Sequence, residues 1–222
     1  METGDYRTQL DNVRKKIAGL EHLYTDEGLK YLRNAMSLCI SIAEENLEKQ
    51  ENIWENAGLG QEFLEYSNHL LQFEHTVNAV PHAAGKMAEC IIDHPRLRLK
   101  IMRVGLEALH YIEMNTMHEL SITEDLRDAI RIYENNIAAA DSGKFDEIVQ
   151  EGHLKSDPIE WTAQWEEVID KADEIVYKRL GDYPRGMGFC HALWHERTTV
   201  LREQFGIEWR SPSAMNPHVL FD

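Results

Sequence analysis

The sequence has little cysteine: three residues in 222, Cys39, Cys90 and Cys190. Three thiols so far apart cannot build a disulfide framework or a cysteine-rich zinc site. The sequence also lacks an apolar run long enough to cross a bilayer, and its first residues, METGDYRTQLDNVRKK, lack the apolar stretch of a signal peptide. We therefore expect a soluble, cytoplasmic protein whose thiols are reduced and mostly buried.

Positive charge is also scarce. The chain has 23 Lys and Arg residues against 39 Asp and Glu residues, which gives a formal net charge of −16. Binding of nucleic acid or of an anionic membrane needs a positive field that such a composition does not easily supply. We therefore expect neither a nucleic-acid partner nor a membrane partner. The sequence also has no Gly-x-Ser-x-Gly nucleophile elbow and no standard glycine-rich phosphate loop.

Hydrophobic residues make up 43% of the chain and recur at helical spacing, without long runs of strict alternation. This pattern predicts an all-α protein of about seven or eight helices. No internal repeat and no Gly/Ser linker is visible, so we expect one bundle-like domain over residues 1–222. A clear core helix follows a cap at Thr25 or Asp26, and its apolar stripe contains Leu29, Leu32, Met36, Cys39, Ile40, Ala43 and Leu47.

Local signals predict where other helices begin and end. Gly58 and Gly60 are expected to interrupt helical structure, and Pro81 is expected to end the third helix. Asp157-Pro158-Ile159-Glu160 has the form of a strong helix start, and a regular apolar stripe follows it over residues 161–180.

The C-terminal part of the chain is rich in aromatic residues. A last helix is expected from about residue 187 to residue 205, with Gly206 as its C-terminal cap. Disordered tails lack aromatic residues of the kind found at Trp209 and Phe221. Residues 207–222 should therefore form an ordered, irregular coil docked on the helical body.

Eleven histidines include one pair with ligand spacing on a predicted helix, His191 and His195. Residues four apart lie one turn above each other, so both imidazoles could reach one zinc or iron ion. His110 is a candidate third ligand, with His69 and His75 as alternatives. The competing interpretation is that His191 and His195 are half-buried and hydrogen-bonded to neighbouring groups.

Four arginines stand out in the otherwise acidic C-terminal part: Arg185, Arg197, Arg202 and Arg210. Together with Trp209 they could form a local positive pocket for an anion or for an acidic loop of a partner. Alternatively, each arginine pairs with a carboxylate in its own fold.

Charge is also segregated along the chain. Residues 141–182 hold twelve acidic and five basic side chains, whereas Arg96, Arg98, Lys100 and Arg103 form a basic cluster. These stretches could pair within the fold, or the acidic helix could bind a basic partner.

Our leading hypothesis is a non-enzymatic cytoplasmic protein, without a cofactor, that binds a protein partner as an adaptor, inhibitor or immunity-type protein. It would use its acidic helical surface or its C-terminal segment. The main alternative is a metal-dependent enzyme, with zinc or iron held by the His-x-x-x-His pair. A third is a small-molecule-binding bundle lined by Trp161, Trp165, Trp194 and Trp209. The sequence leaves the oligomeric state open.

Overall fold

The structure, a computed structural model, describes residues 5–150 and 152–221, and these contain helices and no strand. The all-α prediction is confirmed, and eight of the helices in this part of the chain have seven or more residues. The α-helices are α1 (Tyr6–Ala18), α2 (Asp26–Lys49), α3 (Asn56–Leu70), α4 (Glu74–Val77), α5 (Val80–Cys90), α6 (Pro95–Thr116), α7 (Ser121–Asp141), α8 (Ala163–Leu180), α9 (Phe189–Phe205) and α10 (Pro212–Met215). Short 3₁₀ helices are η1 (Ile53–Glu55), η2 (Phe145–Glu147) and η3 (Pro158–Trp161).

The chain forms two compact units. Unit 1 takes in the described residues of 1–49, 55–92 and 97–131, and unit 2 those of 50–54, 93–96 and 132–222. Helices α6 and α7 contribute residues to both units. The expectation of a single domain stays a prediction.

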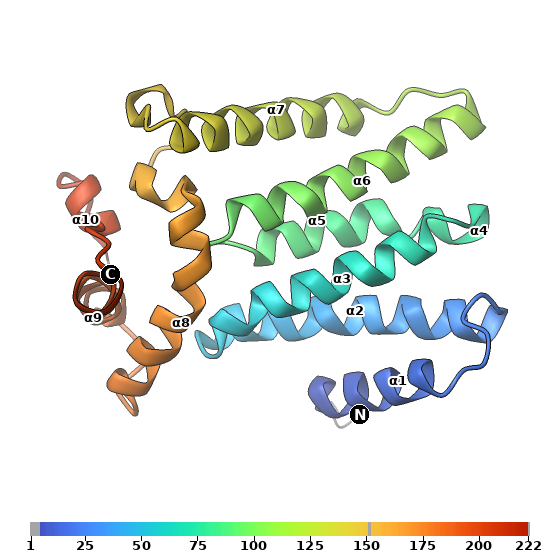
Figure 1. Cartoon of the computed structure of the whole chain (residues 1–222), viewed down its shortest axis with the longest axis horizontal. Coiled ribbons are helices and arrows are strands. Elements are labelled where there is room, and N and C mark those ends of the chain that lie inside the picture. The colour runs from blue at the N-terminus through green and yellow to red at the C-terminus, as the bar shows by residue number, and fades with distance from the viewer. Residues whose placement is uncertain (1–4, 151, 222) are drawn as a thin grey trace. The chain divides into compact units, whose positions relative to one another are not determined.

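In unit 1, helix α2 packs against α1, α3 and α5. Figure 1 shows α1 and α3 beside α2. The Oγ1 of Thr25 accepts a hydrogen bond of 3.1 Å from the backbone N–H of Gly28, so α2 begins with the predicted cap. The predicted stripe of α2 is buried from Leu29 to Ala43. The largest fully buried side chains of this unit are Leu10, Leu32, Met36, Ile42, Phe63, Leu70, Met87, Ile91 and Ile101.

Two predicted boundaries in unit 1 are wrong. Gly58 and Gly60 lie inside α3, and a Cβ added to Gly60 would lie only 3.0 Å from Cδ1 of Ile91. Gly60 therefore allows Ile91 to pack closely against α3 and does not end the helix. Pro81 lies in the first turn of α5, where its missing N–H costs no intrahelical hydrogen bond, so it begins a helix.

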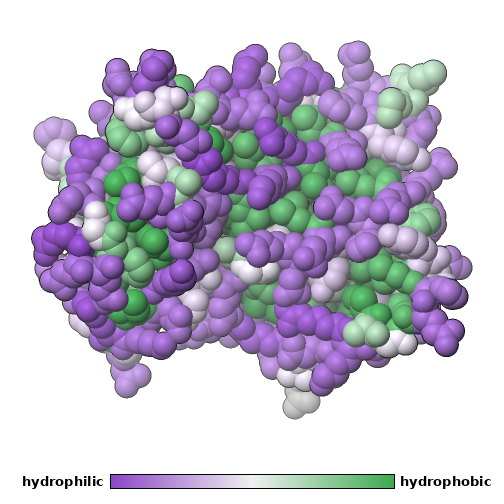
Figure 2. All heavy atoms as spheres, viewed as in Figure 1, coloured by the Kyte–Doolittle hydropathy of each residue, from purple (hydrophilic) through white to green (hydrophobic). Residues whose placement is uncertain are grey.

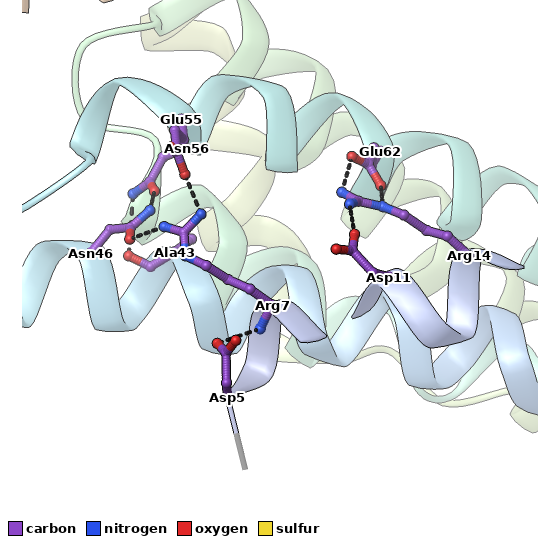
Figure 3. A network of polar contacts seen from close by, with 9 residues as sticks. All are labelled: Asp5, Arg7, Asp11, Arg14, Ala43, Asn46, Glu55, Asn56 and Glu62. Carbon is purple, nitrogen blue, oxygen red and sulfur yellow. Dashed lines mark hydrogen bonds and ion pairs between the residues drawn. The ribbon is translucent and has the colours of Figure 1, made fainter. Parts of the chain in front are cut away.

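A polar network joins α1 to its neighbours (Figure 3). Arg7 pairs with Glu55 and donates a bond of 2.9 Å to Oδ1 of Asn46. The buried Asn46 amide donates a hydrogen bond of 2.8 Å to Oδ1 of Asn56. The amide of Asn56 in turn donates to the backbone carbonyls of Ala43 and Cys90. Two turns further along α1, Arg14 binds Glu62 bidentately, at 2.5 and 3.0 Å, and also binds Asp11 (Figure 3). These bonds satisfy buried polar groups and fix where α1 sits.

The face shown in Figure 2 is mostly hydrophilic, with strips of hydrophobic side chains between rows of hydrophilic ones. Within the described ranges, no helix is both long enough and apolar enough to span a membrane.

Unit 2 is built around the pair α8 and α9. Its buried core consists of Trp165, Ile169, Ala172, Val176, Val200, Leu201, Ile207 and Trp209. The predicted helix start at Asp157 begins only the 3₁₀ turn η3, and α8 begins after Thr162, whose side chain accepts from the N–H of Trp165. The capping signal was therefore correct for a helical turn and wrong for the long helix.

The described part of the C-terminal segment packs on unit 2 at its start, and residues 212–215 form the short helix α10 where an irregular coil was expected. Gly206 ends α9 in the left-handed region at φ 68°, a conformation that glycine adopts without strain. Ile207 and Trp209 are then only 1% and 4% exposed. Ser211 accepts from the N–H of Ala214 and caps the short helix α10.

Candidate functional site

A groove of about 350 Å³ lies in unit 2 between α9 and the start of α10. It is lined by His191, Trp194, His195, Thr198, Thr199, Arg202, Ser211 and Ser213. The spacing of the first six places them along one face of α9, and the two serines belong to the C-terminal segment. None of these described lining residues is acidic, which is notable in a chain with a net charge of −16.

Several hydrogen bonds fix the groove walls. The hydroxyl of Thr198 donates to the carbonyl of Trp194 at 2.8 Å, and that of Thr199 to the carbonyl of His195 at 3.0 Å. The Oγ atoms of Ser211 and Ser213 lie 3.0 Å apart, so one hydroxyl can donate to the other and the second retains its proton for a ligand.

His191 is held from the end of the described chain. Its Nε2 lies 3.1 Å from the carbonyl oxygen of Phe221, and because a carbonyl only accepts, Nε2 must carry the proton. The Trp194 ring packs edge-on against both His191 and Phe221. The imidazole is exposed but fixed in position by these contacts.

Arg202 and His195 are the groove's exposed donors. Within the described chain, neither side chain makes a hydrogen bond or an ion pair with another residue. A guanidinium always carries its charge, and an imidazole gains a second N–H donor when it is protonated. The groove therefore presents a permanent positive charge, two imidazoles and a serine hydroxyl, which is a donor set suited to an oxyanion.

Three sets of hydrogen bonds hold the segment that carries Ser211 and Ser213, called here the serine wall; we call these bonds the clasp. The Nε1 of Trp209 donates a hydrogen bond of 2.7 Å to Oε1 of Glu160. Asp157 accepts from the backbone N–H of Arg210 at 2.7 Å and from its guanidinium at 3.1 Å. Asn216 exchanges two bonds of 2.8 Å with the backbone of Lys155. Ser211 and Ser213 lie between these anchors, so the clasp determines their place in the groove.

Beneath the segment lies a buried charge cluster centred on Arg197. Its guanidinium binds Asp173 bidentately, at 2.8 and 2.5 Å, and reaches Asp93 at 3.3 Å. Its Cζ lies 5.6 Å from the centroid of the Trp209 ring. Burial raises the pKa of Asp173 even though Arg197 favours its charged form.

Glu160 borders the same cluster. Burial raises the pKa of its carboxyl to about 7, while the hydrogen bond from Trp209 opposes the shift and the charge of Asp93 adds to it. Glu160 therefore changes its protonation state near neutral pH, directly under the docked C-terminal segment.

The four predicted arginines have different surroundings. Arg197 and Arg210 are engaged with aspartates, as the alternative interpretation expected. Arg185 lies over the Phe189 ring, with its Cζ 4.3 Å from the centroid, and donates to the carbonyls of Gly181 and Tyr183. Of the four, Arg202 lines the groove.

The predicted metal ligands are not gathered into a metal site. His191 and His195 line the groove and are exposed rather than half-buried, whereas His110 belongs to unit 1, with its Nε2 3.2 Å from Arg127. His69 is bonded to Tyr24 at 3.0 Å, and His75 packs against Phe73. Across residues 5–150 and 152–221, no three His, Cys, Asp or Glu side chains are grouped so that they could hold a metal ion.

The remaining candidates have structural surroundings. Trp165 packs against Trp209 in the core, and Trp161 packs edge-on against Tyr133. Arg96 of the basic cluster pairs with Asp141, at 2.5 Å, within unit 2. Cys39 and Cys90 are buried free thiols, and burial raises the pKa of each, to about 12 for Cys39 and about 11 for Cys90. Cys190 is a half-buried thiol.

Sequence reasoning missed Asp93, Glu160 and Asp173. One signal was available: Asp173 falls next to Ala172 and three residues before Val176, within the apolar stripe of α8. A carboxylate in a buried stripe requires a cationic partner, and this requirement points to an arginine on a neighbouring helix. Glu160 gave no such signal, because its position fits a capping residue.

Comparison of the chain with protein-family models, with curated proteins and with solved structures finds no match.

Proposed function

We propose that this protein is a non-enzymatic binding protein that recognises an anionic segment of a protein partner in the groove beside α9. One observation carries the proposal: Arg202, His191 and His195 line one groove whose described lining contains no carboxylate. In an acidic chain, a local positive site attracts a negative group of a partner while the rest of the surface repels non-specific polyanions.

Shape and order also support binding. The groove wall is held by hydrogen bonds and by the clasp under Trp209, so little conformational freedom is lost when a ligand enters. Among the described residues, no three His, Cys, Asp or Glu side chains are grouped so that they could hold a metal ion, and we do not propose the metal-dependent alternative.

Affinity capture with a charge-matched control tests the proposal. The immobilised chain is incubated with cell extract at increasing salt, beside the variants Arg202→Glu and Arg33→Glu. Arg33 is exposed on α2 in unit 1, so both variants change the net charge equally. We expect partners identified by mass spectrometry to be retained by wild type and Arg33→Glu, lost with Arg202→Glu, and released by salt. Equal retention by both variants would contradict the proposal.

A further inference from the structure

The side chains that line the groove come from two segments of the chain. Arg202, His191 and His195 lie along one face of α9, and Ser211 and Ser213 line the groove from the C-terminal segment. A carboxylate has two coplanar oxygens, and one guanidinium can bind both of them in a bidentate pair. A phosphate monoester has three terminal oxygens spread around a tetrahedral atom, so it accepts donors from several directions at once. A donor set drawn from two segments fits the tetrahedral group better.

Charge gives the same preference. A phosphate monoester carries about −1.5 to −2 charges near neutral pH, so it interacts more strongly with a guanidinium and imidazoles than a carboxylate does. The groove volume of about 350 Å³ accommodates such a group with part of the chain that bears it.

The surroundings restrict the source of the phosphate. Glu203 and Glu208 are exposed in the same part of the chain, and the whole protein carries −16. A nucleic acid or an anionic membrane would bring many further negative charges against this surface. A single phosphorylated residue flanked by basic side chains would bring only one phosphate group, and its flanks would be attracted to the surrounding carboxylates.

We infer that the groove binds a phosphorylated serine or threonine in a partner segment with basic flanks, through Arg202, His191, His195 and the Ser211–Ser213 wall. This inference rests on the proposed function and specifies the ligand of the same site. Arg202 supplies the fixed charge, His195 supplies an N–H donor, and Ser211 or Ser213 supplies a hydroxyl donor, whereas the Nε2–H of His191 is already donated to Phe221.

Three fluorescent peptides of one lysine-flanked sequence, carrying serine, phosphoserine or glutamate at the centre, test the inference by anisotropy on the full chain. We expect the phosphoserine peptide to bind at least about tenfold more tightly than the other two, and inorganic phosphate to compete with it. Arg202→Gln should remove this advantage, and the Ser211→Ala/Ser213→Ala double variant should weaken it. Arg33→Gln, the matched control, should leave it unchanged.

The outcomes separate the two ideas. Equal, Arg202-dependent binding of the glutamate and phosphoserine peptides would overturn the phosphate inference and leave the proposed function standing. Absence of Arg202-dependent binding for both peptides would overturn both. Tighter Arg202-dependent binding to phosphoinositide vesicles or to an oligonucleotide than to the phosphoserine peptide would overturn the assignment to a protein segment.

Discussion

The indole Nε1 of Trp209 donates a hydrogen bond of 2.7 Å to Oε1 of Glu160, a half-buried residue. Trp209 is the aromatic anchor of the C-terminal segment, and Ser211 and Ser213 follow it directly along the groove wall. The groove and the buried charge cluster are therefore physically connected. A change in Glu160 should affect both the stability of unit 2 and the position of the serine wall.

Glu160→Gln should make stability less dependent on pH. The pKa of Glu160 is raised from 4.5 to about 7 in the folded chain, so folding favours the protonated carboxyl. Its stabilising contribution is complete below the unfolded pKa and is lost as the pH rises through about 7. Glutamine keeps an acceptor for Trp209 and carries no charge. We expect the variant to exceed wild type in free energy of unfolding by up to about 3 kcal/mol at alkaline pH, with the difference shrinking toward acid. A difference that does not vary with pH would contradict this account.

Trp209→Phe keeps an aromatic ring in the core and removes the donor to Glu160. The loss leaves a half-buried carboxyl without that partner, and we expect the free energy of unfolding in urea to fall by about 1–3 kcal/mol. Binding of the phosphoserine peptide should weaken as well, because the segment that carries Ser211 and Ser213 loses one of its anchors. Trp54→Phe is the control: Trp54 is half-buried and packs against Tyr177, away from the groove lining, so peptide affinity should be unchanged. Equal effects of the two variants on peptide affinity would show that the Trp209–Glu160 hydrogen bond does not position the groove residues.

Arg197→Met should be strongly destabilising. The substitution leaves Asp173 and Asp93 without their cation in a buried site, which costs about 3–5 kcal/mol. Arg179→Met removes a more exposed arginine, paired with Glu196 at 3.3 Å, and should cost less than about 1 kcal/mol. Urea unfolding of both variants provides the measurement. Similar losses for the two arginines would show that the cluster does not stabilise the fold as described.

Two glycines in unit 1 should respond in opposite directions to alanine. A Cβ at Gly28 would lie 2.0 Å from the carbonyl oxygen of Leu23, so the backbone must move, and we expect a loss of about 1–3 kcal/mol. A Cβ at Gly58 meets nothing within 4 Å inside α3, so alanine should add about 0.5–1 kcal/mol through its better helix propensity. If chemical denaturation showed equal effects, the packing at Gly28 would be wrong.

The sequence predicted what depends on periodicity and local capping. The stripe of α2, the Thr25 cap and the Gly206 cap depend on residues close in the chain, and all are present. Pro81 and Gly60 were misread because the same residue can end a helix, begin one or allow close packing, and distant side chains such as Ile91 decide which.

The site was less predictable than the fold. The spacing of His191 and His195 correctly placed both on one face of α9, but a third partner cannot be identified from spacing alone. Ser211 and Ser213 join the groove only because the segment turns back at Gly206 and is clasped by Asp157 and Glu160. These contacts span about fifty residues of sequence and leave no periodic signal.

The most direct test of the groove is an NMR titration of the histidine side chains with inorganic phosphate, using ¹⁵N-labelled chain and the Arg202→Gln variant. In wild type, the imidazole signals of His195 and His191 should shift saturably, whereas those of His22 and His153, which are not among the groove residues, should not. Arg202→Gln should abolish the saturable shift. Uniform, non-saturating shifts of all histidines, or saturable shifts that persist in Arg202→Gln, would contradict an anion site in this groove.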